Sequence, residues 1–308
     1  MNTKILGVAS WLLLTLALIV DANAASRFWV GGTGTWDAAD TTHWAATSGG
    51  AGGQTVPGSA DTVTFDGSSG GGTVTVNTTV TVQSITMGAF TGTLDFSANN
   101  NNVTLSGSGG VSFSGTGSGT RTLNMGNGTW TLTVTATAGN SCNPWNVATT
   151  TGLTFNANSS TIVISGSSAG VKNFQGGGLT YNTVTIAANA GGGPTSISGA
   201  NTFANLNVTG PNLIVISSAA TQTITNAFTW AGSSSAPIWV GPSSSLTSGA
   251  VGTISVASGA PTMSWAAVSH VTFTGGATFT ATNSLDLGGN TGVTITPPSS
   301  GGGRIIGG

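Results

Sequence analysis

The residues best suited to chemistry lie close together near the start of the chain. Asp37, Asp40 and His43 recur at every third position, and Trp36 and Trp44 lie beside them. Carboxylates and an imidazole can bind a metal ion, and an exposed tryptophan can stack on a sugar ring. Metal sites need more ligands or a recognised spacing, however, and the first of these carboxylates is typical of an Asx turn. We therefore predict no metal site, and we take Trp36 and Trp44 as the candidate ligand-binding residues.

The other carboxylates are spread along the chain. Asp61 and Asp66 flank one expected strand at turn positions, and hydrogen bonding within turns explains both. Hydrolysis of a glycan by acid-base catalysis needs two converging carboxylates. Asp95 is expected to face outward from its strand, but the equivalent residues one repeat away are Thr64 and Asn124. We therefore predict no catalytic residue and no cofactor, and we expect that the chain is not an enzyme.

Composition narrows the fold class and the partners. Only 4% of the residues are charged, Glu is absent, and the formal net charge is −2. Five basic side chains can neutralise only a few phosphates. We therefore expect no nucleic-acid partner. Strand-forming Val and Thr and turn-forming Gly and Asn are common, whereas the helix formers Glu, Lys and Arg are absent or rare. The composition predicts an all-β protein.

The start of the chain has the three parts of an export signal. Lys4 gives a positive start, residues 5–20 are an apolar and small-residue run, and Ala22-Asn23-Ala24 is an A-x-A cleavage site. We predict cleavage before Ala25, with no membrane segment left in the mature chain; an uncleaved membrane anchor is the alternative. The expected location is extracellular, at a cell surface or on a virion, with the periplasm as a further option.

The single cysteine, Cys142, cannot form a disulfide within the chain. Free cysteines are usually buried. We therefore expect a buried thiol and a fold stabilised by packing and backbone hydrogen bonds.

An internal repeat sets the expected architecture. Each unit of about 26–31 residues begins with an apolar residue, a second residue of any type, and another apolar or aromatic residue. The first triplets are Val63-Thr64-Phe65, Leu94-Asp95-Phe96, Leu123-Asn124-Met125, Leu153-Thr154-Phe155, Leu179-Thr180-Tyr181 and Leu206-Asn207-Val208. A second triplet follows each first one, beginning at Val74, Val103, Leu132, Ile162, Val184 and Ile214, and a third often follows.

This pattern predicts a parallel β-solenoid, right-handed and three-sided. Residues i and i+2 of a strand face the same side, so each triplet puts two apolar side chains inward and one polar side chain outward. Stacked units then share a continuous core. At about 4.8 Å per coil, roughly nine to eleven coils would make a rod of about 45–55 Å. A β-sandwich or barrel of hairpins is the alternative.

The expected organisation has five parts. They are a signal peptide (1–24), a Trp-rich N-terminal cap (25–58), regular coils (59–226), less regular coils (227–296) and a flexible Gly/Pro-rich tail (297–308). A cap is expected because the open edge of an end coil would otherwise add strands from other chains.

Several stretches of the chain resemble a known class of proteins. They read FWVGGTGTWDAADTTHW, PGSADTVTFDG, GTLDFSANNNNVTLSG, GTWTLTV, GGGLTYNTVTI and GGATFTATNSLDLGGNTGVTIT. In these residues the chain is similar to the parallel β-helix proteins of secreted bacterial adhesins and phage-associated fibre or surface proteins. The resemblance implies a fold and an extracellular or virion-surface setting, and it implies no catalytic residue.

Three functions remain in competition. The first is a non-enzymatic structural or adhesive surface protein, a rod that presents Thr, Ser and Asn to a glycan or a protein partner. The second is a glycan-degrading β-helix enzyme. The third is a self-assembling fibre subunit, which would make the chain a homo-oligomer.

Overall fold

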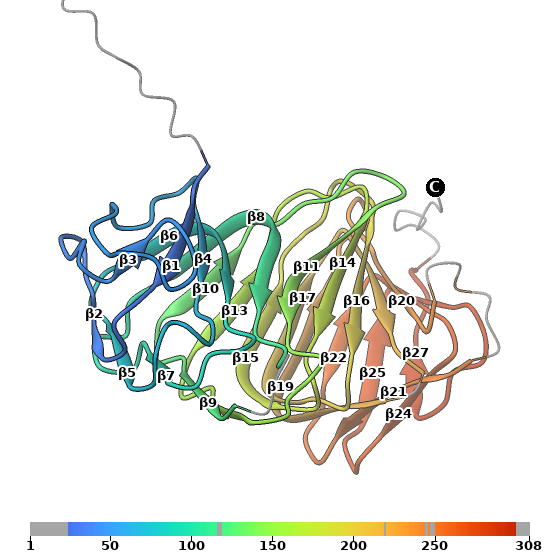
Figure 1. The fold of residues 1–308 in the computed structure, drawn as a ribbon. Helices are drawn as coiled ribbons and strands as arrows, with labels where there is room; N and C mark the ends of the chain where they lie inside the picture. Colours follow the sequence, from blue (N-terminus) through green and yellow to red (C-terminus); the bar gives the residue numbers. More distant parts are fainter. Residues whose placement is uncertain (1–23, 116–118, 219, 244–245, 247–249, 300–308) are drawn as a thin grey trace, which may run out of the picture.

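The structure is a computed structural model that describes residues 24–115, 119–218, 220–243, 246 and 250–299 (Figure 1). Every regular element in these ranges is a β-strand, so the predicted all-β class is confirmed. Among the same residues, no helix has the length and apolarity needed to cross a membrane. Residues 1–23 of the predicted signal peptide and residues 300–308 of the predicted tail lie outside the described part of the chain.

The chain winds round an axis and, in most turns, lays a strand segment on each of three faces. We name them faces A, B and C in the order in which the chain visits them. The stacked strands of each face run parallel. The strands of face A are β1 (Ser26–Trp29), β4 (Thr62–Thr64), the second halves of β6 (Val80–Thr86) and β8 (Val103–Ser112), β11 (Ser141–Asn146), β14 (Val171–Gln175), β16 (Pro194–Ser198), β18 (Asn212–Ile216), β20 (Ile238–Gly241), β23 (Ala266–Val268) and β26 (Leu285–Asp286).

Faces B and C share several strands that bend round the corner between them. Face B consists of β2 (Gly34–Trp36), β5 (Thr73–Val76), β7 (Thr93–Asp95), β9 (Arg121–Asn124) and β12 (Leu153–Asn156), then the first parts of β15 (Thr180–Ile186), β17 (Thr202–Thr209) and β19 (Thr221–Ala231), then β21 (Gly252–Val256) and β24 (Val271–Thr274). Face C consists of the first halves of β6 and β8, then β10 (Thr129–Leu132), β13 (Thr161–Ile164), the second parts of β15, β17 and β19, β22 (Thr262–Ser264), β25 (Phe279–Thr282) and β27 (Val293–Ile295).

The N-terminal segment closes one end of the coils. Its strands β1 and β2 are already part of the solenoid, because they pair in parallel with β4 and β5. The short strand β3 (Trp44–Ala45) runs antiparallel to β1 and places Ala45 opposite Phe28. The segment predicted as a cap therefore supplies the first strands of faces A and B as well as covering them.

Alternation along each strand builds the core. On face C, one inward residue of each coil stacks on its counterpart in the next, and most of this column is aliphatic. The column runs through Val82, Leu105, Leu132, Ile164, Ile186, Val208, Trp230, Met263, Ala281 and Ile295. Nearly all of these side chains are buried and belong to one continuous hydrophobic cluster.

The predicted repeat register is correct in the middle of the chain and wrong at its ends. The repeat groups Val63 with Leu94, but Val63 lies on face A, where it pairs with Ile85. It also groups Leu206 with the face-B triplets, but Leu206 lies on face C, where it pairs with Val184. The reason is that coil length varies: the step along the chain from β5 to β7 is much shorter than the step from β9 to β12. A unit of fixed length therefore slips by one face wherever a coil is short.

Two cationic side chains point into the interior. Arg121 is buried and donates hydrogen bonds to the carbonyl oxygens of Phe113, Thr149 and Thr151. Lys172 is 0% exposed, and its Nζ donates to the Gly166 carbonyl at 3.1 Å. Burial lowers the pKa of Lys172 to about 8, since a desolvated ammonium is costly.

The Lys172 ammonium predicts an unusual dependence of stability on pH. Because its pKa in the folded chain is about 8 and its ordinary value is 10.5, the unfolded chain binds more protons between these values. The free energy of unfolding should therefore rise from pH 8 to pH 9.5, by about 2 kcal/mol. Lys172→Met should raise stability at pH 7 and remove the rise, as chemical denaturation at each pH would show.

The thiol of Cys142 needs a control in that experiment. Burial raises the pKa of Cys142, so this group makes stability fall above its ordinary pKa of 9.0. The lysine variant and its parent should therefore both carry Cys142→Ala. An equal rise with pH in both chains would contradict the assignment to Lys172.

Candidate functional site

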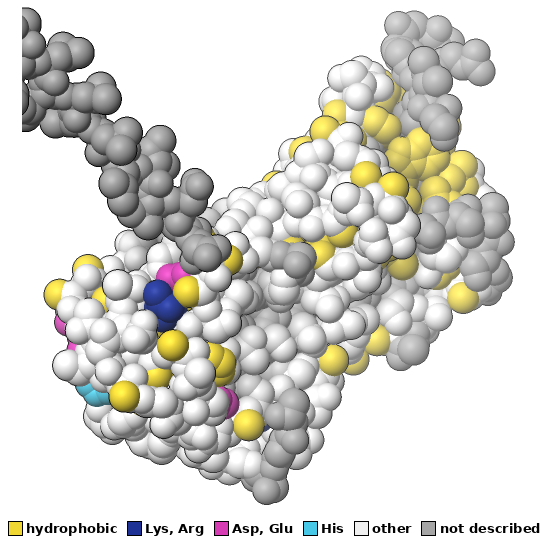
Figure 2. All heavy atoms as spheres, turned by 45° about the horizontal axis from the view of Figure 1, so that its top comes forward, with side chains coloured by type: hydrophobic (Ala, Val, Ile, Leu, Met, Phe, Trp, Pro, Cys, Tyr) yellow, Lys and Arg dark blue, Asp and Glu magenta, His cyan; other side chains and the backbone are white. Residues whose placement is uncertain are grey.

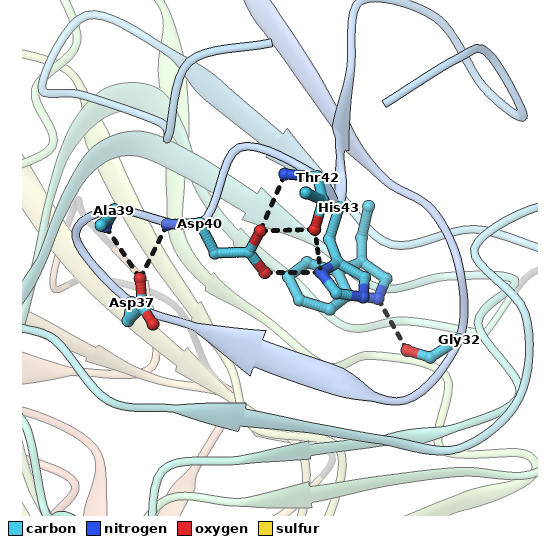
Figure 3. A network of polar contacts seen from close by, with 7 residues as sticks. Gly32, Asp37, Ala39, Asp40, Thr42 and His43 are labelled. Atoms are coloured by element: carbon cyan, nitrogen blue, oxygen red, sulfur yellow. Dashed lines mark hydrogen bonds and ion pairs between the residues drawn. The ribbon is translucent and has the colours of Figure 1, made fainter. Parts of the chain in front are cut away.

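The described part of the chain contains one hydrogen-bonded pair of titratable side chains, in the loop that follows β2 (Figure 3). Asp40 Oδ2 lies 2.5 Å from His43 Nδ1, and Asp40 Oδ1 accepts bonds from the backbone N–H and the hydroxyl of Thr42. Asp37 Oδ1 accepts the N–H groups of Ala39 and Asp40, which is the Asx turn predicted for it. The sequence therefore predicted the local geometry of Asp37 correctly.

Packing fixes the imidazole of this pair. The His43 ring stacks on the Trp29 ring, with centroids 4.6 Å apart and planes 9° apart. A methyl group at Gly34 would lie within 3 Å of the imidazole edge, so glycine is needed there. Burial acts to raise the pKa of Asp40, but the hydrogen bonds from Thr42 and His43 outweigh it and hold that pKa below its ordinary value of 3.8.

The geometry argues against a catalytic triad at this pair. In a triad the nucleophile and the carboxylate contact opposite nitrogens of the imidazole, so that one nitrogen takes the proton of the nucleophile while the carboxylate orients the ring through the other. Here the Thr42 hydroxyl, at 3.1 Å, and the Asp40 carboxylate both contact Nδ1 of His43. Within the described residues no cluster of three metal-ligating side chains occurs. The arrangement ties Asp40, Thr42 and His43 together within the cap loop.

Trp36 and Trp44, the candidate ligand-binding residues, lie in the core of the cap. They are 1% and 0% exposed, and their rings are 5.1 Å apart in an edge-to-face arrangement. Both also pack near Phe65, whose ring is tilted to Trp36 and edge-to-face to Trp44, with centroids 6.1 Å and 6.3 Å away. The edge of Trp36 reaches a hollow of about 350 Å³, but neither ring offers a face to a ligand. We correct the prediction accordingly: the apolar ends of the first coils need large side chains to cover them, and these two residues do so.

Most carboxylates serve turns. In each of five Asp residues, one carboxylate oxygen accepts the backbone N–H two positions further on, as Asx turns require. These residues are Asp37, Asp40, Asp66, Asp95 and Asp286. The prediction of turn hydrogen bonding for Asp66 is confirmed.

The outward side of face C carries a long row of uncharged side chains. Neighbouring members are ladder partners, so the row has the coil spacing of about 4.8 Å. Its members are Thr81, Thr104, Thr131, Val163, Thr185, Asn207, Thr229, Thr262, Thr280 and Thr294. Figure 2 shows a surface of the same character, on which the visible charged side chains gather at the end formed by the N-terminal strands.

Face B is interrupted between β12 and β15. β12 pairs with β9 on one side only, and β15 does not pair with the preceding coil until Thr183, on face C. Inward residues of β7 and β9 such as Leu94 and Leu123 are fully buried, whereas Leu153 and Phe155 of β12 are only half-buried. The two coils separate here on one of the three faces.

Backbone polar groups face the interruption from both sides. Asn156 O accepts a hydrogen bond from Met125 N of the preceding coil, so the backbone groups of Asn156 point towards β9. Successive residues of a strand point their backbone groups to opposite sides. Phe155, one residue earlier, therefore directs its N–H and C=O away from β9 and into the gap. Thr202 N bonds to Leu179 O, so Thr180 likewise directs its backbone groups back towards β12. Neither residue has a ladder partner across the gap among the described strands.

The interruption forms a cleft, which we call the face-B cleft, of about 430 Å³. Inside it the rings of Phe155 and Tyr181 approach to 5.2 Å and close the floor. The Tyr181 hydroxyl is turned inward, where it bonds to Trp145 Nε1 and Gly176 O. The residues that line the cleft are Phe155, Asn156, Ala157, Asn158, Thr180, Tyr181, Asn182 and Ala204, and none of them is charged.

Sequence reasoning missed this cleft for a physical reason. Leu153-Thr154-Phe155 has the same apolar alternation as the other triplets of the repeat, and the sequence shows no break after it. The only local signal is the run of Asn residues on both sides, at Asn156, Asn158 and Asn182.

Comparison with known proteins finds no relative: no family model, no curated protein and no solved structure matches the chain.

The lowered pKa of Asp40 gives a prediction for the cap. Its carboxylate contributes stability that is present above pH 3.8 and is lost as the pH falls through the lower pKa of the folded chain. Asp40→Asn should therefore destabilise the cap at pH 7 and reduce its further loss of stability between pH 4 and pH 2. Tryptophan fluorescence during urea unfolding would report it, with Asp286→Asn at the far end as control. If both variants lost stability between pH 4 and pH 2 as the parent does, the result would contradict the assignment to Asp40.

Proposed function

We propose that the chain is an exported, non-enzymatic adhesive rod that binds a neutral glycan in the face-B cleft. The cleft carries this proposal, because it is a concave site of ligand size at the place where the face-B ladder is broken. Its volume of about 430 Å³ falls within the range of about 300–1,000 Å³ that is typical of ligand sites.

The chemistry of the cleft suits an uncharged, hydroxyl-rich ligand. Asn156, Asn158 and Asn182 provide side-chain amides, and each uses one end within the protein: Asn156 and Asn182 donate to Asn124 and Ser160, and Asn158 accepts from Gly126. An amide has two N–H donors and an oxygen acceptor, so each keeps further hydrogen-bonding capacity for a ligand. The half-buried ring of Phe155 offers an apolar surface of the kind on which a sugar ring packs. With no charged residue in its lining, the cleft has no group that would favour a phosphate, a carboxylate or an amine.

The backbone groups at the edges of the cleft support the same kind of ligand. Phe155 and Thr180 each direct an N–H donor and a C=O acceptor towards the cleft. Phe155 is half-buried, and backbone groups that are removed from water need partners. A polyol that enters between the coils can supply them. The rod then serves as a stiff support that holds the site in place, which fits a protein displayed at a surface outside the cell.

The alternative of a glycan-degrading enzyme has less support. The lining of the cleft contains no carboxylate, and retaining or inverting hydrolysis needs two of them. Asp95, the carboxylate of face B, bonds to Ser97 in its own turn. Binding without turnover is the expectation that follows.

A substitution that fills the face-B cleft tests whether the glycan binds there. Ala204→Phe would place a ring in the cleft without removing a hydrogen bond, and Ala187→Phe would add the same ring at a half-buried alanine just after β15. The mature chain should bind a member of a neutral-glycan array. Ala204→Phe should weaken that binding at least about tenfold by calorimetry, which is about 1.4 kcal/mol, and Ala187→Phe should leave it unchanged.

Two results would contradict the proposal. One is an array with no bound glycan, and the other is equal weakening by both variants. Reducing sugar released from any bound glycan would favour the enzyme instead.

A further inference from the structure

Asp61 is the one carboxylate whose bonds differ from those of the other described Asp residues. It is 8% exposed, so its charge is largely removed from water. Its Oδ2 accepts Gly58 N at 2.9 Å, which closes a local turn. Its Oδ1 accepts the backbone nitrogen of Ala25 at 3.0 Å, from a residue 36 positions away.

No cation pairs with this carboxylate in the described part of the chain. The ion pair found there joins Asp40 and His43. The nearby Arg27 directs its guanidinium to Thr55 and to the carbonyl of Ser26. Carboxylates are rarely buried without a partner of opposite charge, because desolvation of an unpaired charge is costly.

Ala25 is also where the ladder of face A begins. Its carbonyl accepts Thr62 N at 3.0 Å, and Ser26 is the first residue in register with β4. Ala24, one residue earlier, is exposed. The peptide bond between Ala24 and Ala25 therefore lies at the boundary between the solenoid and the preceding segment.

The sequence independently marks the same bond for cleavage, since Ala22-Asn23-Ala24 is an A-x-A motif after an apolar run. We propose that cleavage there turns the Ala25 nitrogen into an α-ammonium group that forms an ion pair with Asp61 and locks β1 onto β4. This inference rests on the export signal in the proposed function and is independent of glycan binding.

The chemistry of the step is simple. A signal peptidase hydrolyses the Ala24–Ala25 bond with one water molecule. The oxygen of the water becomes part of the Ala24 carboxylate, and its two protons go to the Ala25 nitrogen, which becomes –NH3⁺. The amide of the precursor offers Asp61 one neutral N–H. The ammonium offers three donors and a positive charge at the same place, and charge-assisted hydrogen bonds are roughly twice as strong as neutral ones. Processing thus converts a neutral contact into a charged one.

The experiment compares two forms of the chain at one backbone amide. One form begins at Ala25 and the other retains Asn23 and Ala24, which moves the ammonium away from Asp61. Hydrogen exchange of the Thr62 amide, which bonds to Ala25 O, reports the local stability of β1 on β4. We expect this amide to exchange about tenfold more slowly in the form that begins at Ala25.

Variants of the carboxylate separate charge from chain length. Asp61→Asn should abolish the difference between the two forms, whereas Asp66→Asn, which alters a turn carboxylate of the same region, should preserve it. Acetylation of the Ala25 amine removes the charge while Asp61 is kept, and it should speed exchange by a similar factor. The proposal is overturned if both forms exchange equally, or if their difference persists in Asp61→Asn.

The N-terminal residue of exported protein separates the processing step from the ion pair. A first residue of Ala25 supports the processing site. An exported chain that keeps residues 1–24 would overturn both the cleavage site and the ion pair, whereas cleavage at Ala25 without any effect of Asp61 would overturn the ion pair alone.

Discussion

Everything in this molecule depends on backbone hydrogen bonds between successive coils. With 4% charged residues and one cysteine, the chain can form no internal disulfide, and its described part has a single ion pair. Each coil contributes a strand to three parallel ladders, and each inward side chain stacks on its counterpart in the next coil. The ladder therefore fixes the core, the rows on the surface and the place where a break can occur.

The few charged and polar side chains inside the solenoid reinforce this pairing at its corners. Arg121 binds carbonyl oxygens from two coils, and Asn201 bonds to both Ser198 O and Gln222 of the next coil. Asp61 joins the start of β1 to the turn before β4 in the same way. Such contacts satisfy backbone groups that the turns leave unpaired, which the ladder alone cannot do.

The sequence was informative wherever a feature depends on neighbouring residues. Strand alternation, the burial of Cys142 and the turn bonds of Asp37 and Asp66 follow from local patterns, and the structure confirms them. Features that depend on the stacking of coils could not be predicted from the sequence. Trp36 has the local sequence of a surface anchor, but its burial is decided by Phe65, which the next coil supplies. The contact of Asp61 with Ala25 and the gap beside Phe155 likewise depend on which residues the winding brings together.

The central claim is that the ladder of face B is broken at the cleft while faces A and C continue. Amide hydrogen exchange of the mature chain, resolved by residue, tests it most directly. We predict slow exchange at Thr154, which faces β9, and at Thr183, which bonds to Ser160 O, with much faster exchange at Phe155 and Thr180. If the amides of Phe155 and Thr180 were protected as well as those of Thr154 and Thr183, the ladder of face B would be continuous. That result would contradict both the cleft and the function proposed for it.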